Sequence, residues 1–277
     1  MATTHNLNNV VIDRVLRGIY STNKDGIIFS LNQVQNLSLN CTSESQEVVD
    51  AMGVSIMEFM RSKAIEASAE NAIFDLGLMA SQYGTEKVVA SSTNKLIVPT
   101  MESFEAKANP DKTLEAYTLK HTPVTAPTAI YALNGDSTLG TKYTSAVTGS
   151  ADKFVYSNGT IMLPTSVTAG TELFVMYDYE SESAVEVINS ANKFPTMGKM
   201  TFECLVYDVC DPETKIFAYI ILPRFQLKSD FDWSVGGDSQ THPFSGKAHV
   251  NYCDKNKEMV RIVIVDESED DESEDDE

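Results

Sequence analysis

Basic residues are scarce in this sequence. Lysine and arginine together number 21, against 40 aspartate and glutamate residues, and the formal net charge is −19. Every contact with a nucleic-acid phosphate needs a cation, so this balance disfavours non-specific binding to DNA or RNA. Ten of the carboxylates lie in residues 266–277, and the rest of the chain carries only −9 of the net charge. We therefore expect a moderately acidic folded body that does not work by binding nucleic acid.

Long apolar runs and cysteines are also few. No run approaches the roughly 18 apolar residues that a membrane-spanning helix requires. Residues 1–9 lack the basic start and apolar stretch of a secretory leader. A chain of 277 residues can bury a core without disulfides. We expect a cytosolic chain without membrane association and with free, mostly buried thiols. The four cysteines are Cys41, Cys204, Cys210 and Cys253.

Assembled sets of catalytic or metal-binding residues are missing as well. No HExxH motif or CxxC pair accompanies the four histidines, and no GxSxG elbow occurs. The GGD triplet at residues 236–238 has no following lysine, which excludes a P-loop. We predict no enzymatic activity and assign no catalytic, cofactor-binding or metal-binding residue. The histidines are expected to lie on the surface or in hydrogen bonds: His5, His121, His242 and His249.

Neighbouring carboxylates are the remaining candidates for chemistry. The two pairs are Asp208 with Asp211, and Asp230 with Asp232. Such pairs can flank a sugar or a calcium ion, but in an acidic chain they more often mark a solvated strand face or a turn. Phe231 and Trp233 alternate with the second pair. This alternation predicts a strand with both aromatic rings on its buried face.

Turn residues and short β-prone segments dominate the rest of the chain. Asp25-Gly26 separates apolar runs at residues 15–20 and 27–31, which indicates a hairpin. Residues 69–83 form the clearest helix candidate, with Ser68 as the expected N-cap and Gly84 as the expected C-cap. We predict a mainly β fold, a sandwich or barrel with one flanking helix. Longer strands are expected at residues 200–207, 215–223, 245–252 and 258–265.

A change of composition divides the chain. Asn109-Pro110-Asp111 marks a turn, and the residues that follow are rich in Thr, Tyr, Val and Gly, with short strands closely spaced. We therefore expect a small β-sandwich or barrel at residues 113–187, inserted into a larger β domain made of residues 1–112 and 188–265. Its strands are expected at residues 129–133, 154–156, 160–163 and 173–179.

Residues 266–277 repeat a five-residue acidic unit. Their like charges repel and they offer no apolar surface to bury, so we expect a disordered acidic tail. Repulsion between the tails of neighbouring copies should weaken as salt is added. From charge alone, the tail is therefore expected to oppose association at low salt.

The second half of the chain resembles the tail tube, or major tail, proteins of tailed bacteriophages. The stretches that carry the resemblance are GTIMLP at residues 159–164, AGTELFVMYDY at 169–179, KFP at 193–195, LPRF at 222–225 and GDSQTHPF at 237–244. The resemblance covers roughly residues 125–265.

This resemblance implies a β-sandwich with a flanking helix that closes with copies of itself into a ring. Hexameric rings would stack into a tube, and an immunoglobulin-like domain would be inserted on the outside. It implies no catalytic residues and no cofactor. The implied partners are the chain itself and the tape-measure, tail terminator and baseplate or tail-tip proteins, with DNA only as passing cargo. The implied location is the virion tail, assembled in the host bacterial cytoplasm.

Two other functions remain as hypotheses. The first is a capsid or other virion structural protein, and the second is a carbohydrate-binding or adhesion β protein. All three hypotheses describe a protein that acts through its surfaces.

Overall fold

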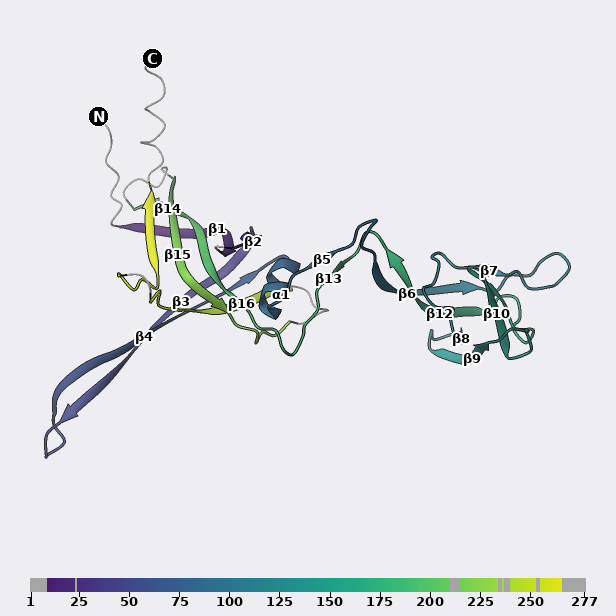
Figure 1. Ribbon diagram of the computed structural model, residues 1–277, viewed down its shortest axis with the longest axis horizontal. Helices are drawn as coiled ribbons and strands as arrows, with labels where there is room; N and C mark the ends of the chain where they lie inside the picture. Colours follow the sequence, from purple (N-terminus) through teal and green to yellow (C-terminus); the bar gives the residue numbers. More distant parts are fainter. Residues whose placement is uncertain are drawn as a thin grey trace, which may run out of the picture. The chain divides into compact units, whose positions relative to one another are not determined.

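The computed structural model describes residues 9–22, 24–209, 215–233, 236, 240–252 and 255–265. The chain divides into two compact units, Met1–Lys87 with Val187–Glu277, and Val88–Glu186. It is mainly β with one short helix (Figure 1). This fold class confirms the prediction from the strand and turn pattern. The acidic residues 266–277 lie outside the described part of the chain.

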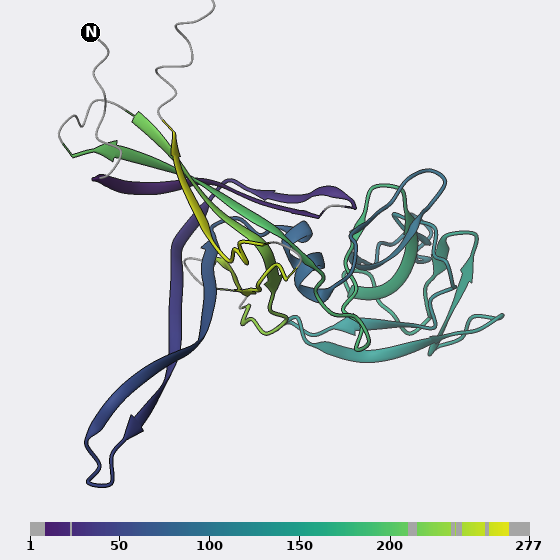
Figure 2. The same ribbon diagram turned by 60° about the vertical axis from the view of Figure 1, so that its left-hand side comes forward.

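The first unit is built on an eight-stranded antiparallel sheet. The strand order is β2-β1-β14-β15-β16-β4-β3, and β17 also pairs with β15. The sheet curls into a half-barrel (Figure 2). Its elements are β1 (Val10–Thr22), β2 (Gly26–Leu31), β3 (Val34–Val49), β4 (Ser55–Asn71), α1 (Leu76–Tyr83), β14 (Met197–Asp208), β15 (Lys215–Leu227), β16 (His242–Ala248) and β17 (Arg261–Val265).

The core of this unit follows from the alternation along its central strands. In β14, Met200, Phe202, Cys204 and Val206 are fully buried and share one face of the sheet. Each such side chain contributes about 1.5–3 kcal/mol when it leaves water. Leu78 of α1 joins the same apolar cluster, so the helix covers part of this face.

The helix is shorter than the sequence predicts. It begins after Asp75, whose Oδ1 accepts a hydrogen bond from the Leu78 backbone N–H at 2.7 Å, and it ends at Gly84 in the left-handed region with φ 70°. The expected start at residue 69 and the expected Ser68 cap are wrong. Residues 69–71 end strand β4, where backbone ladders to both β3 and β16 outweigh the weak local preference for helix.

The second unit contains a seven-stranded sheet and a two-stranded one. The larger sheet has the order β6-β12-β8-β9-β10-β11-β7, and β5 pairs with β13 in the smaller. Its core includes the fully buried Ile130, Phe154 and Leu173. The strands are β5 (Val88–Val89), β6 (Leu96–Glu105), β7 (Tyr117–Thr118), β8 (Ala129–Leu133), β9 (Leu139–Ser145), β10 (Lys153–Ser157), β11 (Thr160–Met162), β12 (Glu172–Ser181) and β13 (Val185–Glu186).

The second unit starts earlier than residue 113, the expected boundary. All ten residues of β6 pair with β12, from Leu96 opposite Ser181 to Glu105 opposite Glu172. A strand that pairs along its whole length belongs to the sheet of its partner. Residues 88–112 are therefore part of this unit.

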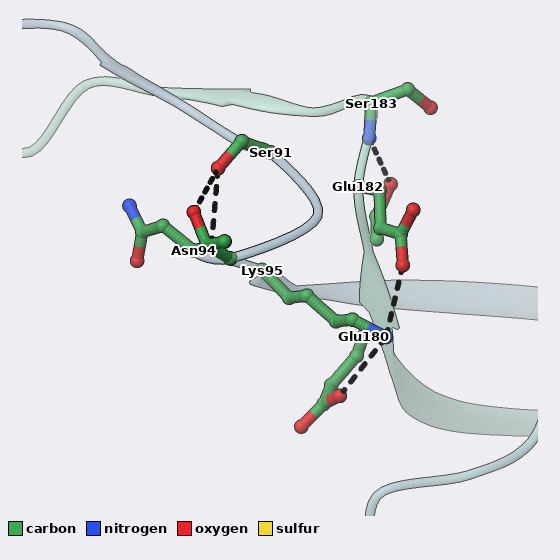
Figure 3. Close-up of polar contacts among 8 residues, drawn as sticks. Ser91, Asn94, Lys95, Glu180, Glu182 and Ser183 are labelled. Atoms are coloured by element: carbon green, nitrogen blue, oxygen red, sulfur yellow. Dashed lines mark hydrogen bonds and ion pairs between the residues drawn. The ribbon is translucent and has the colours of Figure 1, made fainter.

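The ends of the second unit are tied together by polar contacts. β5 and β13 pair antiparallel, and just beyond them Lys95 Nζ lies 3.0 Å from Glu182 Oε1 and 3.9 Å from Glu180 Oε2 (Figure 3). The hydrogen bond to Glu182 and the charges of both glutamates raise the pKa of Lys95. The Ser91 hydroxyl accepts a hydrogen bond from the Asn94 N–H at 3.1 Å and shapes the turn before β6. These exposed contacts fix local geometry more than they stabilise the fold.

The strand expected around Phe231 and Trp233 does not form. Residues 228–233 have no strand, and the Trp233 side chain is 44 % exposed. Its ring stacks on Phe74 with a centroid distance of 4.8 Å. The Phe231 ring lies 5.8 Å from that of Tyr83 in α1, so Phe231 and Trp233 lie beside the helix instead of filling the core of a sheet.

Candidate self-association surfaces

A long β-hairpin arm is the most prominent surface feature of the first unit. β3 and β4 pair along nearly their whole length, but β16 pairs with β4 only from Ile65 to Asn71. Beyond that point the hairpin continues as a free two-stranded ribbon, visible in Figures 1 and 2. We call residues 42–63 the arm. Its nine β4 residues, 55–63, extend about 30 Å at roughly 3.3 Å per residue.

The arm carries an unusual share of exposed apolar side chains. Every residue of β4 from 55 to 63 is exposed, and Met52 at the tip is 87 % exposed. Isolated hairpins are marginal in water, and exposed apolar clusters mark interaction surfaces. The exposed apolar residues are Val48, Val49, Met52, Val54, Ile56, Met57, Phe59 and Met60.

The tip of the arm is held by its own hydrogen bonds. Asp50 Oδ1 accepts from the Met52 and Val54 backbone N–H groups, each at 2.8 Å. Gly53 adopts φ 81°, which other residues rarely do. Along the ribbon, Arg61 donates to Gln46 Oε1 at 2.8 Å and its guanidinium lies over the Phe59 ring. The apolar side chains are thus presented on an ordered turn, which lowers the entropic cost of docking.

The curled sheet also leaves open edges. β2 and β3 lie at its two ends, and among the described residues β14 is the only strand that pairs with residues 10–17 of β1. Unpaired backbone donors and acceptors on an edge are ready to pair with a strand of another chain. Between β1 and β3 lies a groove of about 450 Å³ whose lining includes Val15, Leu37 and Ile220. Edges and groove together give the half-barrel surfaces that further copies can complete.

His242 is a buried structural residue. It is 1 % exposed, its Nδ1 accepts from the Asp75 N–H at 3.4 Å, and its Nε2 lies 2.9 Å from Gln82 Oε1. Because Nδ1 accepts, Nε2 carries the proton and donates to Gln82. Gln82 in turn donates to the Pro243 carbonyl at 3.1 Å. Burial lowers the pKa of His242, and this effect outweighs the charge of Asp75, which acts to raise it. The histidine fastens α1 to β16.

The other sequence candidates are not brought together. His121 stacks on Tyr179 at 3.9 Å in the second unit, and His249 is half-buried beyond the end of β16. Asp230 and Asp232 are exposed. Asp208 is buried at the end of β14. Three candidates lie outside the described residues: His5, Asp211 and residues 237–238 of the GGD triplet.

The cysteines divide between exposed and buried positions. Cys204 is buried, and burial raises the pKa of its thiol. Cys41 is exposed, contrary to the expectation of mostly buried thiols. Both are free, while Cys210 and Cys253 fall outside the described part of the chain. Within that part, no group of three potential metal ligands occurs and no helix is long and apolar enough to cross a membrane.

One buried polar centre escaped the sequence analysis. Glu102 of β6 is 1 % exposed and accepts hydrogen bonds from the hydroxyls of Tyr177 and Tyr117 and from the Lys120 N–H. Burial and the carboxylate raise the pKa of both tyrosines. Each donor of the cluster points at the carboxylate, so the centre is satisfied from within and stabilises the second unit. Glu102 differs from an exposed glutamate only through its partner tyrosines, which are distant in the sequence, so the sequence analysis had no local signal for it.

The structure is that of a mainly β protein whose exposed arm and open sheet edges are suited to association with other chains. Residues 11–262 match the model of the YomU/Tube protein family, and the chain belongs to that family. It is a family of phage tail tube proteins, which implies a non-enzymatic structural role, a place in the virion tail and assembly from copies of one chain. A comparison with curated proteins finds no match.

Proposed function

We propose that this chain is the repeating subunit of a phage tail tube, assembling into hexameric rings that stack to form the conduit for DNA ejection. The observation that carries the proposal, beside the family, is the ordered arm with its exposed apolar side chains. Such a surface is costly for a monomer because it stays in contact with water. It is stabilised when a second copy covers it.

Ring closure accounts for the open sheet. A half-barrel that joins its neighbours edge to edge becomes a continuous β wall, and its unpaired edges disappear. The acidic body, at −9 without residues 266–277, would repel DNA phosphates and keep passing DNA from adhering to the wall. We assign no catalytic, metal or cofactor site to this function. The proposed further partners are the tape-measure, tail terminator and baseplate or tail-tip proteins.

The second unit is proposed as an inserted immunoglobulin-like domain. Val88 pairs with Glu186, so the two ends of the insert are neighbours in a ladder. Deleting Val88–Glu186 and joining Lys87 to Val187 by a short linker should leave the first unit folded and able to associate. Cooperative urea unfolding and sedimentation of the shortened chain check this. Insoluble protein would mean that the first unit depends on the insert.

Electron microscopy of the purified full chain tests the proposed function. Negative stain should show rings or tubes with a constant diameter. Shells would favour the capsid hypothesis. Monomers that bind a glycan array would favour the adhesion hypothesis and contradict the proposal.

A further inference from the structure

A basic groove lies in the curled sheet of this acidic protein. It measures about 270 Å³ and is bordered by the end of β1, the start of β14 and the later half of β15. Lys199 and Arg224 line it, beside the polar side chains of Ser21, Thr22 and Asn251. Of the described residues that line the groove, none is a carboxylate.

The two cations of the groove have no acidic partner among the described residues. Neither enters an ion pair within the described part of the chain. Arg224 is half-buried, and its Nε contacts the Met197 Sδ at 3.0 Å. A partly desolvated guanidinium without a counter-charge favours an anion nearby. The Thr22 hydroxyl donates to Asp25 Oδ2 at 3.1 Å, but the Ser21 hydroxyl and the Asn251 amide also lie beside the guanidinium, so the groove is suited to carboxylates or phosphates.

The chain supplies a strongly acidic segment at the other end of the same strands. β17 pairs with β15 from Arg261 opposite Ile221 to Val265 opposite Phe217, so it runs away from Arg224. Residues 266–277 follow directly and carry ten carboxylates. Phe217 and Arg224 are seven residues apart along β15, or about 23 Å. The acidic segment therefore starts at one end of the strands, and the basic groove lies toward the other.

This polarity favours contact between copies. Twelve residues reach at most about 40 Å when extended. Copies placed head to tail along these strands bring the segment of one to the groove of the next, and such a heterologous contact repeats without limit. Docking within one copy requires the chain to reverse its direction.

We propose that residues 266–277 of one copy bind the Lys199–Arg224 groove of a neighbouring copy and thereby strengthen stacking. The proposal rests on the proposed function, because stacked copies provide the head-to-tail placement. It reverses the salt response expected from repulsion between tails alone. Salt screens ion pairs that are open to solvent, because the Debye length of the solution falls from about 30 Å at 0.01 M to about 8 Å at 0.15 M. Assembly should therefore slow as salt is added.

Full-length variants test this contact. The groove variant, Lys199→Glu with Arg224→Glu, reverses the charge of the groove. The control variant, Lys142→Glu with Lys153→Glu, makes the same charge change at exposed lysines of the second unit. Light scattering across a sodium chloride series follows assembly. At low salt the groove variant should assemble about tenfold more slowly than wild type and show a flat salt response, as expected for the loss of one exposed and one half-buried ion pair. The control variant should keep the wild-type response.

A competitor covers the case in which the groove variant does not fold. A synthetic peptide of residues 266–277, added to the wild-type chain at low salt, should slow assembly, while a peptide with glutamine and asparagine in place of the acids should not. A short duplex DNA that competes more strongly than the acidic peptide would assign the groove to a phosphate backbone and overturn the proposal.

Other outcomes separate this proposal from the proposed function. Tubes that form in wild type and groove variant at the same rate, or faster with salt, contradict the docking and leave the tube function intact. Docking within one copy also leaves the groove variant unslowed and counts against the proposal. No tubes at any salt, in any variant, would contradict the proposed function itself.

Discussion

The two halves of the β3–β4 hairpin share strands but differ in their surroundings. In the proximal half, residues 65–71 of β4 lie between β3 and β16, and Ala67 is 1 % exposed. In the arm, β4 has β3 as its only partner strand among the described residues, and Met60 is 71 % exposed. Apolar residues occur in both halves. The proximal half completes its packing within the chain, and we propose that the arm completes its own against another copy.

The largest expected effect is in the proximal half. Ala67→Asp places an unpaired carboxylate at a buried site, which should lower the free energy of unfolding by about 3–5 kcal/mol. Urea unfolding of the full chain measures the change. A loss below about 1 kcal/mol would mean that the curled sheet opens easily, and the contrast between the halves would weaken.

A smaller effect is expected at the aromatic residues beside α1. Trp233→Ala removes a half-exposed ring that stacks on Phe74, so the free energy of unfolding should fall by about 0.5–1.5 kcal/mol. The fully buried tryptophan that the sequence suggests would cost about 3–5 kcal/mol. Urea unfolding distinguishes the two values, and Asp232→Ala next to it serves as the exposed control.

The junction of α1 with the proximal half should respond to pH. His242 lies opposite Asn71 of β4, and burial lowers its folded pKa below the usual 6.5. Below about pH 6.5 the unfolded chain takes up a proton that the folded chain resists, so stability falls until the folded pKa is reached. Above pH 6.5 this residue causes no change. The trend is measured from the urea unfolding midpoints of wild type between pH 5 and pH 8, compared with those of His242→Gln over the same range. Equal slopes for both proteins would count against a neutral buried imidazole.

Local chemistry in the sequence predicted turns better than sheet membership. Two loops share the pattern Asn-x-Asp-x-Thr: in each, the asparagine donates to the threonine hydroxyl, which donates to the aspartate. These hydrogen bonds lower the pKa of Asp111 and Asp136. The first loop was expected to mark a domain boundary, yet both lie inside the second unit. A turn motif shows where the chain reverses but not which strand its flanks will pair with.

Long-range pairing explains the other differences from the sequence predictions. Residues 69–71 fit a helix pattern locally but are held in β4 by strands far away in the chain. No periodic signal in the sequence separates the arm from the proximal half. The arm is exposed because β16 does not extend along it, and that depends on a strand far away in the chain. The β1–β2 hairpin, by contrast, depends on an adjacent Asp-Gly turn, and the structure confirms it.

The smallest expected effect on stability is in the arm. Ile56→Asp changes an exposed residue of β4, so the free energy of unfolding should stay within about 0.5 kcal/mol of wild type. Urea unfolding at a concentration that keeps both proteins monomeric makes the comparison with Ala67→Asp direct. A large loss would show that the arm packs within its own chain.

The decisive measurement is the assembly of the same full-length Ile56→Asp chain, followed by sedimentation and negative-stain microscopy beside wild type. The account predicts that wild type forms tubes and that the variant stays as folded monomers or isolated rings, because a charge replaces an apolar contact between copies. Exposed Lys153→Glu in the second unit should assemble as wild type does. Tubes of normal length from a folded Ile56→Asp chain would contradict the assignment of the arm as an assembly surface.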